Sequence, residues 1–158
     1  TYAFEPHPPT FRRLQENIWL NNSEVVAYDA LLDNQDGCVA FDWNSDEIGS
    51  ALHQINRSLY AEGQKVRAYK LDSFRNFHGL PQPDYLKIDV DGSEFDVLLG
   101  ATMTLPGVKS VLCEMDYDLF PSMELIGALL RDTGFEVKSK HPHGTSTISN
   151  WVFQRADL

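Results

Sequence analysis

The apolar residues of this chain alternate between two kinds of spacing. Steps of three and four residues predict helices, as at Phe11, Leu14 and Ile18, and short apolar runs between turn residues predict strands. The predicted helices cover residues 9–21, 48–59, 94–101 and 125–130. The predicted strands cover residues 1–4, 25–28, 38–43, 65–71, 85–90, 110–115, 135–139 and 151–153.

Capping residues set the ends of the predicted helices. Asn44 or Ser45 suits the start of the second helix and Gly63 its end, and Gly134 ends the last one. Strands that alternate with helices predict an α/β fold with a largely parallel sheet in a single domain, residues 1–158. The last two strands are expected to form an antiparallel pair around the polar loop 141–150.

Charge narrows the partners of this domain. The chain has 13 basic and 23 acidic residues among 158, a formal net charge of −10. Such a chain lacks the positive field that holds a nucleic acid or an anionic membrane surface. No run of 18 apolar residues occurs in it. We therefore expect a small-molecule partner, neutral or cationic, and a homo-oligomer is also compatible with the sequence.

The two cysteines, Cys38 and Cys113, lie far apart in apolar runs. A pair with no disulfide-like spacing favours two reduced core thiols over a disulfide. Reduced thiols indicate a reducing compartment, and we expect the protein in the cytoplasm.

Acidic and imidazole side chains gather where the predicted strands end. In an open parallel α/β sheet, ligands bind beyond the carboxyl ends of the strands. Any one of these side chains could simply be a solvated surface group, but their number favours a site. They are Glu5, Asp29, Asp89, Asp91, Glu114, Asp116, His141 and His143.

Glu5 and Asp29 suit a nucleoside. A carboxylate at a strand tip can accept hydrogen bonds from both hydroxyls of a ribose. The alternative for Glu5 is a partner for the start of the helix that follows. At the next strand end, Asp29 could meet an adenine amino group, and Ala30 would leave room for the ring.

The segment 84–95 carries the strongest signal. Lys87 and Asp89 share one face of an apolar strand by the two-residue period, so they are expected to form an ion pair. A charged pair inside a sheet is costly unless it is compensated. Gly92 would let the backbone approach a ligand at the strand tip.

These residues resemble a known family. The run from Lys87 to Glu94, followed by Val97, Leu98, Gly100 and Ala101, is similar to the signature of FkbM-type methyltransferases. Residues 2–8, 71–73, 111–114 and 150–153 resemble other segments of that family, so the similarity covers nearly the whole chain. The resemblance implies a class I methyltransferase that uses S-adenosylmethionine, with a Rossmann-like, mostly parallel sheet and a C-terminal antiparallel strand.

The same resemblance assigns roles to single residues. Glu5, with Pro6 beside it, would bind the ribose of the cofactor. Asp29 and Ala30 would lie near the adenine, and Asp89 would face the methyl donor.

The family's first strand and its glycine-rich loop have no counterpart in this sequence. In the resembling fold that strand lies between the strands that end at Glu5 and Asp89. We therefore expect the chain to be an N-terminally incomplete methyltransferase domain, part of a longer enzyme. The alternative is a complete domain that works without the loop.

A hydroxyl acceptor must lose its proton as it is methylated. Asp89 is our first choice for that base and Glu114 the second, with Lys87 holding Asp89 ionised. His141 and His143, in a loop at the same edge, are expected near the acceptor with Asp91, and a free imidazole there could also serve as the base. Exposed loop histidines explain the same pattern.

Two alternatives remain open at this point. Asp89, Glu114 and Asp116 would suit magnesium, although their spacing does not require a metal and we expect none. A non-catalytic or degenerate methyltransferase-like scaffold domain is the rival from another class.

Overall fold

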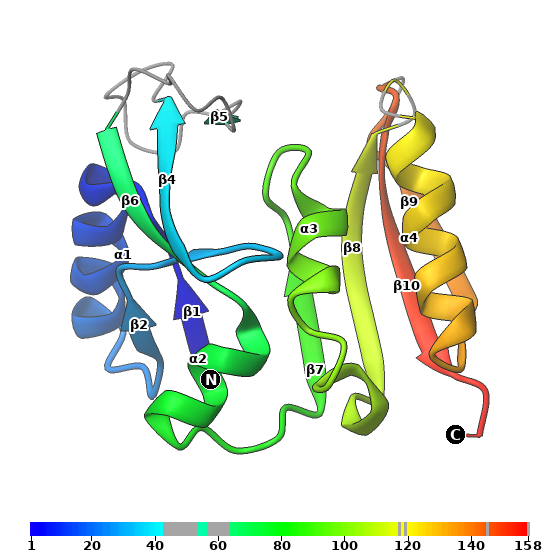
Figure 1. Ribbon diagram of the computed structural model, residues 1–158, viewed down its shortest axis with the longest axis horizontal. Helices are drawn as coiled ribbons and strands as arrows, with labels where there is room; N and C mark the ends of the chain where they lie inside the picture. The colour runs from blue at the N-terminus through cyan, green and yellow to red at the C-terminus, as the bar shows by residue number, and fades with distance from the viewer. Residues whose placement is uncertain (43–53, 57–63, 117, 119, 145, 158) are drawn as a thin grey trace.

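The computed structural model describes residues 1–42, 54–56, 64–116, 118, 120–144 and 146–157, and it shows a mixed α/β fold (Figure 1). The helices are α1 (Pro8–Leu20), α2 (Leu71–His78), α3 (Glu94–Leu99) and α4 (Phe120–Asp132), with a 3-10 turn at Leu105–Gly107. The strands are β1 (Tyr2–Phe4), β2 (Val26–Tyr28), β3 (Leu31–Leu32), β4 (Gly37–Asp42), β5 (Gln54–Asn56), β6 (Gln64–Tyr69), β7 (Tyr85–Ile88), β8 (Ser110–Asp116), β9 (Phe135–Pro142) and β10 (Ile148–Arg155). The described strands form three small sheets, in the orders β1-β2, β3-β6-β4-β5 and β7-β8-β10-β9.

The C-terminal sheet carries the larger hydrophobic core. β7 and β8 are parallel, and β10 runs antiparallel to β8 and β9, which confirms the predicted antiparallel end. The helices α3 and α4 lie on one face of this sheet (Figure 1). Leu98 and Leu130 of these helices are fully buried with Phe153 of β10. Burial of each such side chain stabilises the fold by roughly 1.5–3 kcal/mol.

Strands β9 and β10 are longer than the sequence predicts. Because β9 extends to Pro142 and β10 begins at Ile148, both strands reach into the predicted loop 141–150, and His141 lies within β9 rather than in a loop. Longer strands satisfy more backbone groups in the ladder, and the register runs from Phe135 opposite Arg155 to Pro142 opposite Ser149.

The N-terminal part is built on β1 and β2, which pair in parallel. Helix α1 begins at Pro8, where a missing backbone N–H and a fixed φ suit the first helical turn, and ends at Leu20, close to the prediction. An aromatic cluster packs beneath these strands. The ring of Phe74 in α2 meets Phe4 of β1 edge-on at 5.1 Å and Tyr28 of β2 at 4.9 Å.

Helix α2 is absent from the sequence-based prediction. Its start is capped by a distant side chain, because Asp36 accepts hydrogen bonds from the Lys70 backbone N–H (2.9 Å) and the Ser73 hydroxyl (2.7 Å). A carboxylate there also interacts favourably with the helix dipole. Gly79, at φ 64°, ends the helix in the left-handed conformation.

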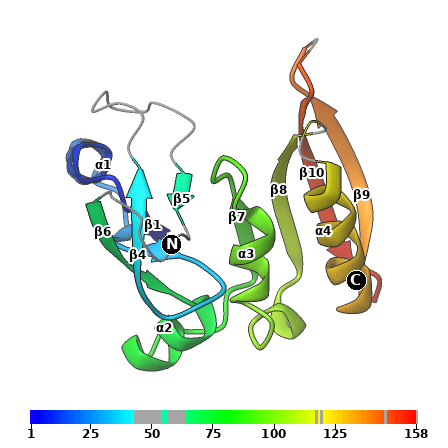
Figure 2. The same ribbon diagram turned by 45° about the horizontal axis from the view of Figure 1, so that its top comes forward.

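The single, mostly parallel sheet expected from the sequence is not present among the described strands. β1 pairs there with β2 alone, and β7 pairs with β8 alone. Figures 1 and 2 show the strands as two separate groups, connected by the segment between α2 and β7. The expected neighbours of a shared central strand therefore lie in different sheets.

The predicted helix 48–59 is wrong where the structure describes it. Gln54–Asn56 forms strand β5, antiparallel to β4, with Ile55 opposite Phe41. The rest of that prediction lies outside the described residues.

The cysteine prediction is half right. Cys38 and Cys113 are both free thiols, but only Cys113 is buried. Cys38 lies near the start of β4 opposite the exposed Arg67, so it is not a core residue. None of the described helices has the length and apolar character needed to cross a bilayer.

The backbone at Gly100, which follows α3, lies close to the backbone at Asp33, which follows β3. This close approach gives the first prediction. A Cβ atom at Gly100 would lie 2.1 Å from the backbone oxygen of Asp33. Gly100→Ala is therefore expected to lower the free energy of unfolding by about 2–3 kcal/mol. Urea denaturation measures this loss.

Gly127 in α4 is the matched control. A Cβ there meets only the far end of the Arg131 side chain, at 3.1 Å. Gly127→Ala is expected to leave stability unchanged or to raise it by about 0.5–1 kcal/mol, because alanine favours a helix interior. Equal effects of the two substitutions would contradict the close approach.

Candidate active site

A cavity of about 520 Å³ lies between β1 and β7, at the carboxyl ends of both strands. This volume suits a nucleoside-sized ligand. Its lining includes six residues that the sequence analysis singled out, brought together from β1, the β2–β3 connection and the β7–α3 turn. They are Glu5, Pro6, Ala30, Lys87, Asp89 and Asp91.

Glu5 is held at the tip of β1 by its neighbours. Its backbone N–H donates to the carbonyl of Tyr28 (3.1 Å), and its Oε1 accepts a hydrogen bond from the backbone N–H of His7 (2.7 Å). One oxygen of the carboxylate therefore serves the start of α1, as the alternative interpretation predicted. The same side chain lines the cavity, so its position suits both roles.

Of the two residues predicted at the end of the next strand, Asp29 and Ala30, only Ala30 lines the cavity. Ala30 is buried and lines the cavity, where its small side chain leaves space. Asp29 is exposed and is absent from the lining. The structure therefore does not bring Asp29 to the predicted cofactor residues.

The turn between β7 and α3 is strained where it reaches the cavity. Asp91 has a φ of 52° and Gly92 a φ of 102°, so a left-handed conformation is imposed on a residue that is not glycine. The buried Glu94 stabilises the turn, since its Oε1 accepts the Gly92 backbone N–H at 2.9 Å. Strain of this kind persists where surrounding structure over-determines it and clusters at functional sites.

Lys87 and Asp89 form the predicted ion pair, with Nζ and Oδ2 at 2.9 Å. The expectation that they lie inside an apolar sheet is wrong, because their side chains are 64% and 41% exposed at the open edge of β7. An exposed pair contributes only about 0–1 kcal/mol. Its value here is that it holds Asp89 at the cavity rim.

Glu114 lies beside this rim and interacts with Asp89. Burial raises the pKa of Glu114, and so do the charge of Asp89 and a hydrogen bond between the two carboxyls. Asp91 raises the pKa further and His143 lowers it. The His143 Nδ1 lies 3.6 Å from the Glu114 Oε1.

Asn150 is a member of the site that sequence reasoning did not assign. Its Nδ2 lies 2.6 Å from the His143 Nε2. It also stands directly opposite Glu114 in the β8–β10 ladder. Only the strand register shows this neighbour, because the two residues are far apart in the chain.

His141 and Asp116 are engaged in other contacts. The His141 ring is engaged with the Ser139 hydroxyl (2.9 Å) on its own strand. Hydrogen bonds from the Thr147 hydroxyl and the Asp118 backbone N–H lower the pKa of Asp116. Among the described residues, no group of three or more His, Cys, Asp or Glu side chains is placed to hold a metal ion. The magnesium alternative therefore gains no geometric support.

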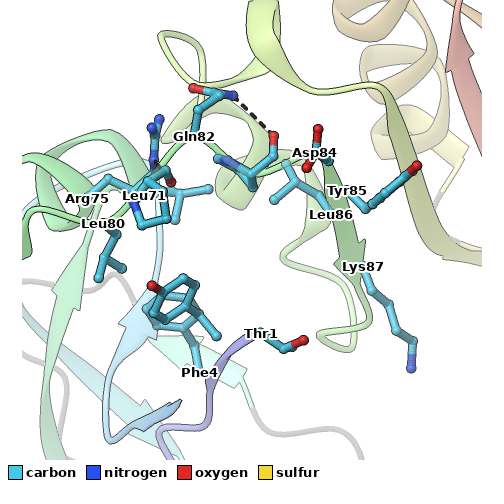
Figure 3. Close-up of a pocket in the computed structure, with 13 residues that line it drawn as sticks. Thr1, Phe4, Leu71, Arg75, Leu80, Gln82, Asp84, Tyr85, Leu86 and Lys87 are labelled. Atoms are coloured by element: carbon cyan, nitrogen blue, oxygen red, sulfur yellow. Dashed lines mark hydrogen bonds between the residues drawn. The ribbon is translucent and has the colours of Figure 1, made fainter. Parts of the chain in front are cut away.

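A second cavity, also of about 520 Å³, continues the space toward the amino ends of β1 and β7. Figure 3 shows Thr1 and Phe4 on one side of it, with Leu86 of β7 on the other. Tyr2, Phe4 and Lys87 line both cavities. Together the cavities follow the facing edges of the two strands along their length.

Comparisons with known proteins identify relatives of the chain. The methyltransferase FkbM domain family matches residues 1–137. The hexuronic acid methyltransferase AglP of Haloferax volcanii is 30% identical over 121 residues, which are 76% of this chain and 48% of that protein. Methyltransferase 1 of Beauveria bassiana is 29% identical over 169 residues, covering 89% of this chain and 64% of that protein.

A third relative is the AMB antimetabolite synthetase AmbE of Pseudomonas aeruginosa, 35% identical over 99 residues, which are 60% of this chain and 4% of that protein. The chain spans about half the length of the first relative and under two thirds of the second. No solved structure matches the chain significantly.

Proposed function

Because the chain belongs to the FkbM methyltransferase family, we propose that it is part of the catalytic domain of an S-adenosylmethionine-dependent O-methyltransferase. The acceptor we propose is a hydroxyl group of a small molecule or a sugar. The observation that carries this proposal is the cavity in which Glu5, Ala30 and Asp89 meet from separate elements. A surface scaffold would not need to bring these side chains together, which favours an enzyme over the scaffold alternative.

The residues present fit the nucleoside half of the cofactor. In this proposal Glu5 accepts hydrogen bonds from the ribose hydroxyls, and Pro6 and Ala30 flank the adenine. Asp29 is left out of this set, because its side chain is exposed and away from the cavity lining. When bound, S-adenosylmethionine supplies an electrophilic methyl group.

The acceptor stands, in this proposal, at the rim formed by Asp89, Asp91 and Glu114. Asp89 accepts the proton of the hydroxyl as the oxygen–carbon bond forms, and Lys87 holds Asp89 in place. Carboxylates dominate this rim, so it favours a neutral or cationic acceptor. The AglP relative, named for a hexuronic acid, makes sugars the first class of acceptor to test, and the carboxylate rim favours a neutral sugar over an acidic one.

The space between β1 and β7 belongs to the same proposal. Glu5 and Asp89 share one cavity, and Thr1 and Asp84 share the other, so β1 and β7 run in the same direction across the space. We propose that a further strand of the complete enzyme lies between them. The result is a single Rossmann-like sheet in the order β2-β1-new strand-β7-β8-β10-β9.

The proposed enzyme works on a small molecule in the cytoplasm and binds neither nucleic acid nor a membrane surface. The net charge of −10 supports this choice of partner. The free, exposed thiol of Cys38 supports a reducing compartment.

Cofactor binding gives the second prediction. In the complete natural protein, Glu5→Ala is expected to weaken the binding of S-adenosylhomocysteine by about ten- to a hundredfold. The reason is that a hydrogen bond to a charged acceptor contributes about 1.5–3 kcal/mol. Isothermal titration calorimetry measures the loss.

Two variants separate binding from folding. Glu5→Gln keeps an acceptor for the His7 backbone N–H but removes the charge, and it should still weaken binding. Asp29→Ala, at an exposed strand end, should bind normally. Unchanged affinity in both Glu5 variants would remove Glu5 from the site, and a wild-type protein that binds no S-adenosylhomocysteine would overturn the proposed function.

A further inference from the structure

His143 lies just after β9, and the reaction proposed above does not use it. Its backbone is held on both sides of the turn. The His143 N–H donates to the Ile148 carbonyl (3.1 Å), and the His143 carbonyl accepts a hydrogen bond from the Ser146 N–H (3.0 Å). The side chain is 43% exposed. The backbone of this residue is therefore fixed, while its ring can be reached by a ligand.

The Asn150 side chain sets the protonation of the His143 ring. Its Nδ2 lies 2.6 Å from the His143 Nε2, and an amide nitrogen can only donate a hydrogen bond. The Nε2 atom therefore accepts, and the ring is neutral with its proton on Nδ1. Asn150 belongs to the β8–β10 ladder, which fixes the position of its backbone. The ring consequently presents an N–H donor on its Nδ1 side.

That donor stands beside an acceptor. The His143 Nδ1 lies 3.6 Å from the Oε1 of Glu114, which stands directly opposite Asn150 in the ladder. A separation of 3.6 Å is too long for a hydrogen bond between the two atoms. An oxygen atom placed between them can lie about 2.8 Å from each, which is the length of a good hydrogen bond. The Glu114 side chain is 22% exposed, so a ligand can reach this position.

A donor and an acceptor at this spacing select a hydroxyl group. A hydroxyl both donates and accepts, so it can donate to Glu114 and accept from His143 at the same time. An ammonium group cannot accept from the Nδ1–H, and a carboxylate cannot donate to Glu114. Like charge also disfavours a carboxylate beside Glu114. The pair therefore suits a neutral, hydroxylated part of a ligand.

This position lies next to the proposed base. Ile88 stands opposite Cys113 in the parallel β7–β8 ladder, so the residues that follow them, Asp89 and Glu114, are neighbours. Neighbouring strands lie about 4.8 Å apart, a distance that one sugar ring bridges with hydroxyls on adjacent carbons. One hydroxyl can therefore meet Asp89 while the next one meets His143 and Glu114.

We propose that Glu114, His143 and Asn150 form a binding subsite for an unmethylated hydroxyl of the acceptor, beside the hydroxyl that Asp89 deprotonates. The acceptor is then a neutral polyol, such as a hexose glycoside, with hydroxyls on neighbouring carbons. This inference rests on the proposed function and names the acceptor class of the same site. Glu114 and His143 contact the acceptor, and Asn150 positions the His143 ring.

The first test needs no acceptor. Long-range proton–nitrogen NMR of the natural protein should show the His143 ring in the Nδ1–H form. Asn150→Leu removes the amide at similar size, and the preference for that form should disappear. A wild-type ring in the Nε2–H form, or an unchanged ring in Asn150→Leu, would overturn the proposal whether or not the protein methylates a sugar.

The second test compares acceptors on the wild type. Methyl glucoside, methyl galactoside and methyl mannoside are incubated with S-adenosylmethionine, and NMR of the product locates the methylated hydroxyl. Deoxy analogues of the best glycoside then replace each neighbouring hydroxyl in turn by hydrogen. One of these analogues should have a KM about three- to tenfold higher, with kcat within about twofold, because a hydrogen bond of this kind contributes about 0.5–1.5 kcal/mol.

His143→Phe separates the subsite from the rest of the rim. The phenyl ring keeps the shape but lacks the donor, so KM for the parent glycoside should rise by about three- to tenfold. The deoxy analogue should then lose nothing further. His141→Phe is the matched control and should leave both KM values unchanged, because the His141 ring is engaged with the Ser139 hydroxyl (2.9 Å).

Two results would overturn the subsite. One is a set of deoxy analogues that the wild type uses as well as the parent, which would mean that the pair holds only water. The other is a His143→Phe variant that still distinguishes the parent from the deoxy analogue. The wild-type comparison decides the question even where His143→Phe does not fold.

Calorimetry with S-adenosylhomocysteine on the same samples separates the two levels of failure. A wild type that binds none fails the proposed function, and the NMR test still decides the state of the His143 ring. A wild type that binds it but methylates none of the glycosides overturns the polyol acceptor and leaves the methyltransferase proposal standing.

Discussion

Asp89→Asn is expected to lower kcat for methyl transfer by about 10²- to 10⁴-fold while the protein stays folded. The amide keeps the shape of the carboxylate but cannot accept the proton of the acceptor hydroxyl, and general base catalysis contributes rate factors of this size. The measurement is turnover on sugar acceptors, beside a thermal melt of the same sample.

Stability should hardly change in this variant. Lys87 loses its partner, but its side chain is 64% exposed, so no charge is left buried. Pairs of this kind contribute about 0–1 kcal/mol. A large fall in melting temperature would show that the pair is structural, and the rate could then not be interpreted as catalysis.

Asp84→Asn is the matched control for Asp89→Asn. Asp84 stands just before β7, and it also forms an ion pair with a lysine, Lys109, at 2.8 Å. It lines the second cavity, at the opposite end of β7 from the proposed acceptor. Turnover in Asp84→Asn should stay near the wild-type value, and an equal loss in both variants would indicate a general effect of removing charge.

The pKa of Glu114 provides an independent check on Asp89→Asn. The charge of Asp89 raises that pKa, so its removal should let the pKa fall toward the ordinary value for glutamate. A carbon-13 NMR titration of the side-chain carboxyls reads this shift without any acceptor. A Glu114 pKa that does not move would mean that the two carboxyls do not interact.

Signals within a few residues predicted the local structure well. Helix α1 begins at the proline pair Pro8 and Pro9 and ends beside Asn21, as the pattern indicates. The two-residue period placed Lys87 and Asp89 together, and the ion pair exists. Both results depend on the chain alone, because the interacting groups are close in sequence.

Several of the failures come from distant contacts. The start of α2 is capped by Asp36, which is 34 residues from Lys70, so this cap is not visible in the local sequence. Leu71 and Phe74, buried and three residues apart, and Gly79 after the helix were local signals that the prediction missed. Ile55 suits a helix by its spacing but pairs with Phe41 in a strand. The exposure of Lys87 depends on what covers the edge of β7, which periodicity does not report.

The residues of the candidate site were likewise predicted only in part from the sequence. The rule that ligands bind at carboxyl ends of strands selected Glu5 and Asp89, and the structure brings both to one cavity. The rule also selected Asp29, but the cavity is lined there by its neighbour Ala30 instead. Asn150 required the β8–β10 register, which sets it opposite Glu114. His141 and His143 look alike in the sequence, and only the fold separates the ring beside Glu114 from the ring beside Ser139.

The last prediction concerns the space between β1 and β7. Among the described strands each has a partner on one side only, and apolar side chains such as Phe4 and Leu86 line the cavities between them. Exposed strand edges beside apolar surface promote association with other chains. Residues 1–158 produced alone should therefore bind a hydrophobic dye or aggregate.

The same chain should gain almost no thermal stability from S-adenosylmethionine. Ligand stabilisation grows with the logarithm of concentration over dissociation constant, and a weakly bound cofactor contributes little. A longer chain that carries the proposed strand between β1 and β7 should behave differently. At a cofactor concentration of about one hundred times Kd, it should gain roughly 2.7 kcal/mol, or a rise in Tm of about 5–10 °C.

Three outcomes of this comparison are distinct. A complete protein that binds no dye and is stabilised, beside a short chain that is not, supports the proposed strand between β1 and β7. A short chain that forms a stable dimer in light scattering would indicate that a second copy covers the edges instead. A soluble, cooperatively melting monomer of 158 residues that the cofactor stabilises would contradict the proposal, because the two described strand groups would then bind the cofactor without a further strand.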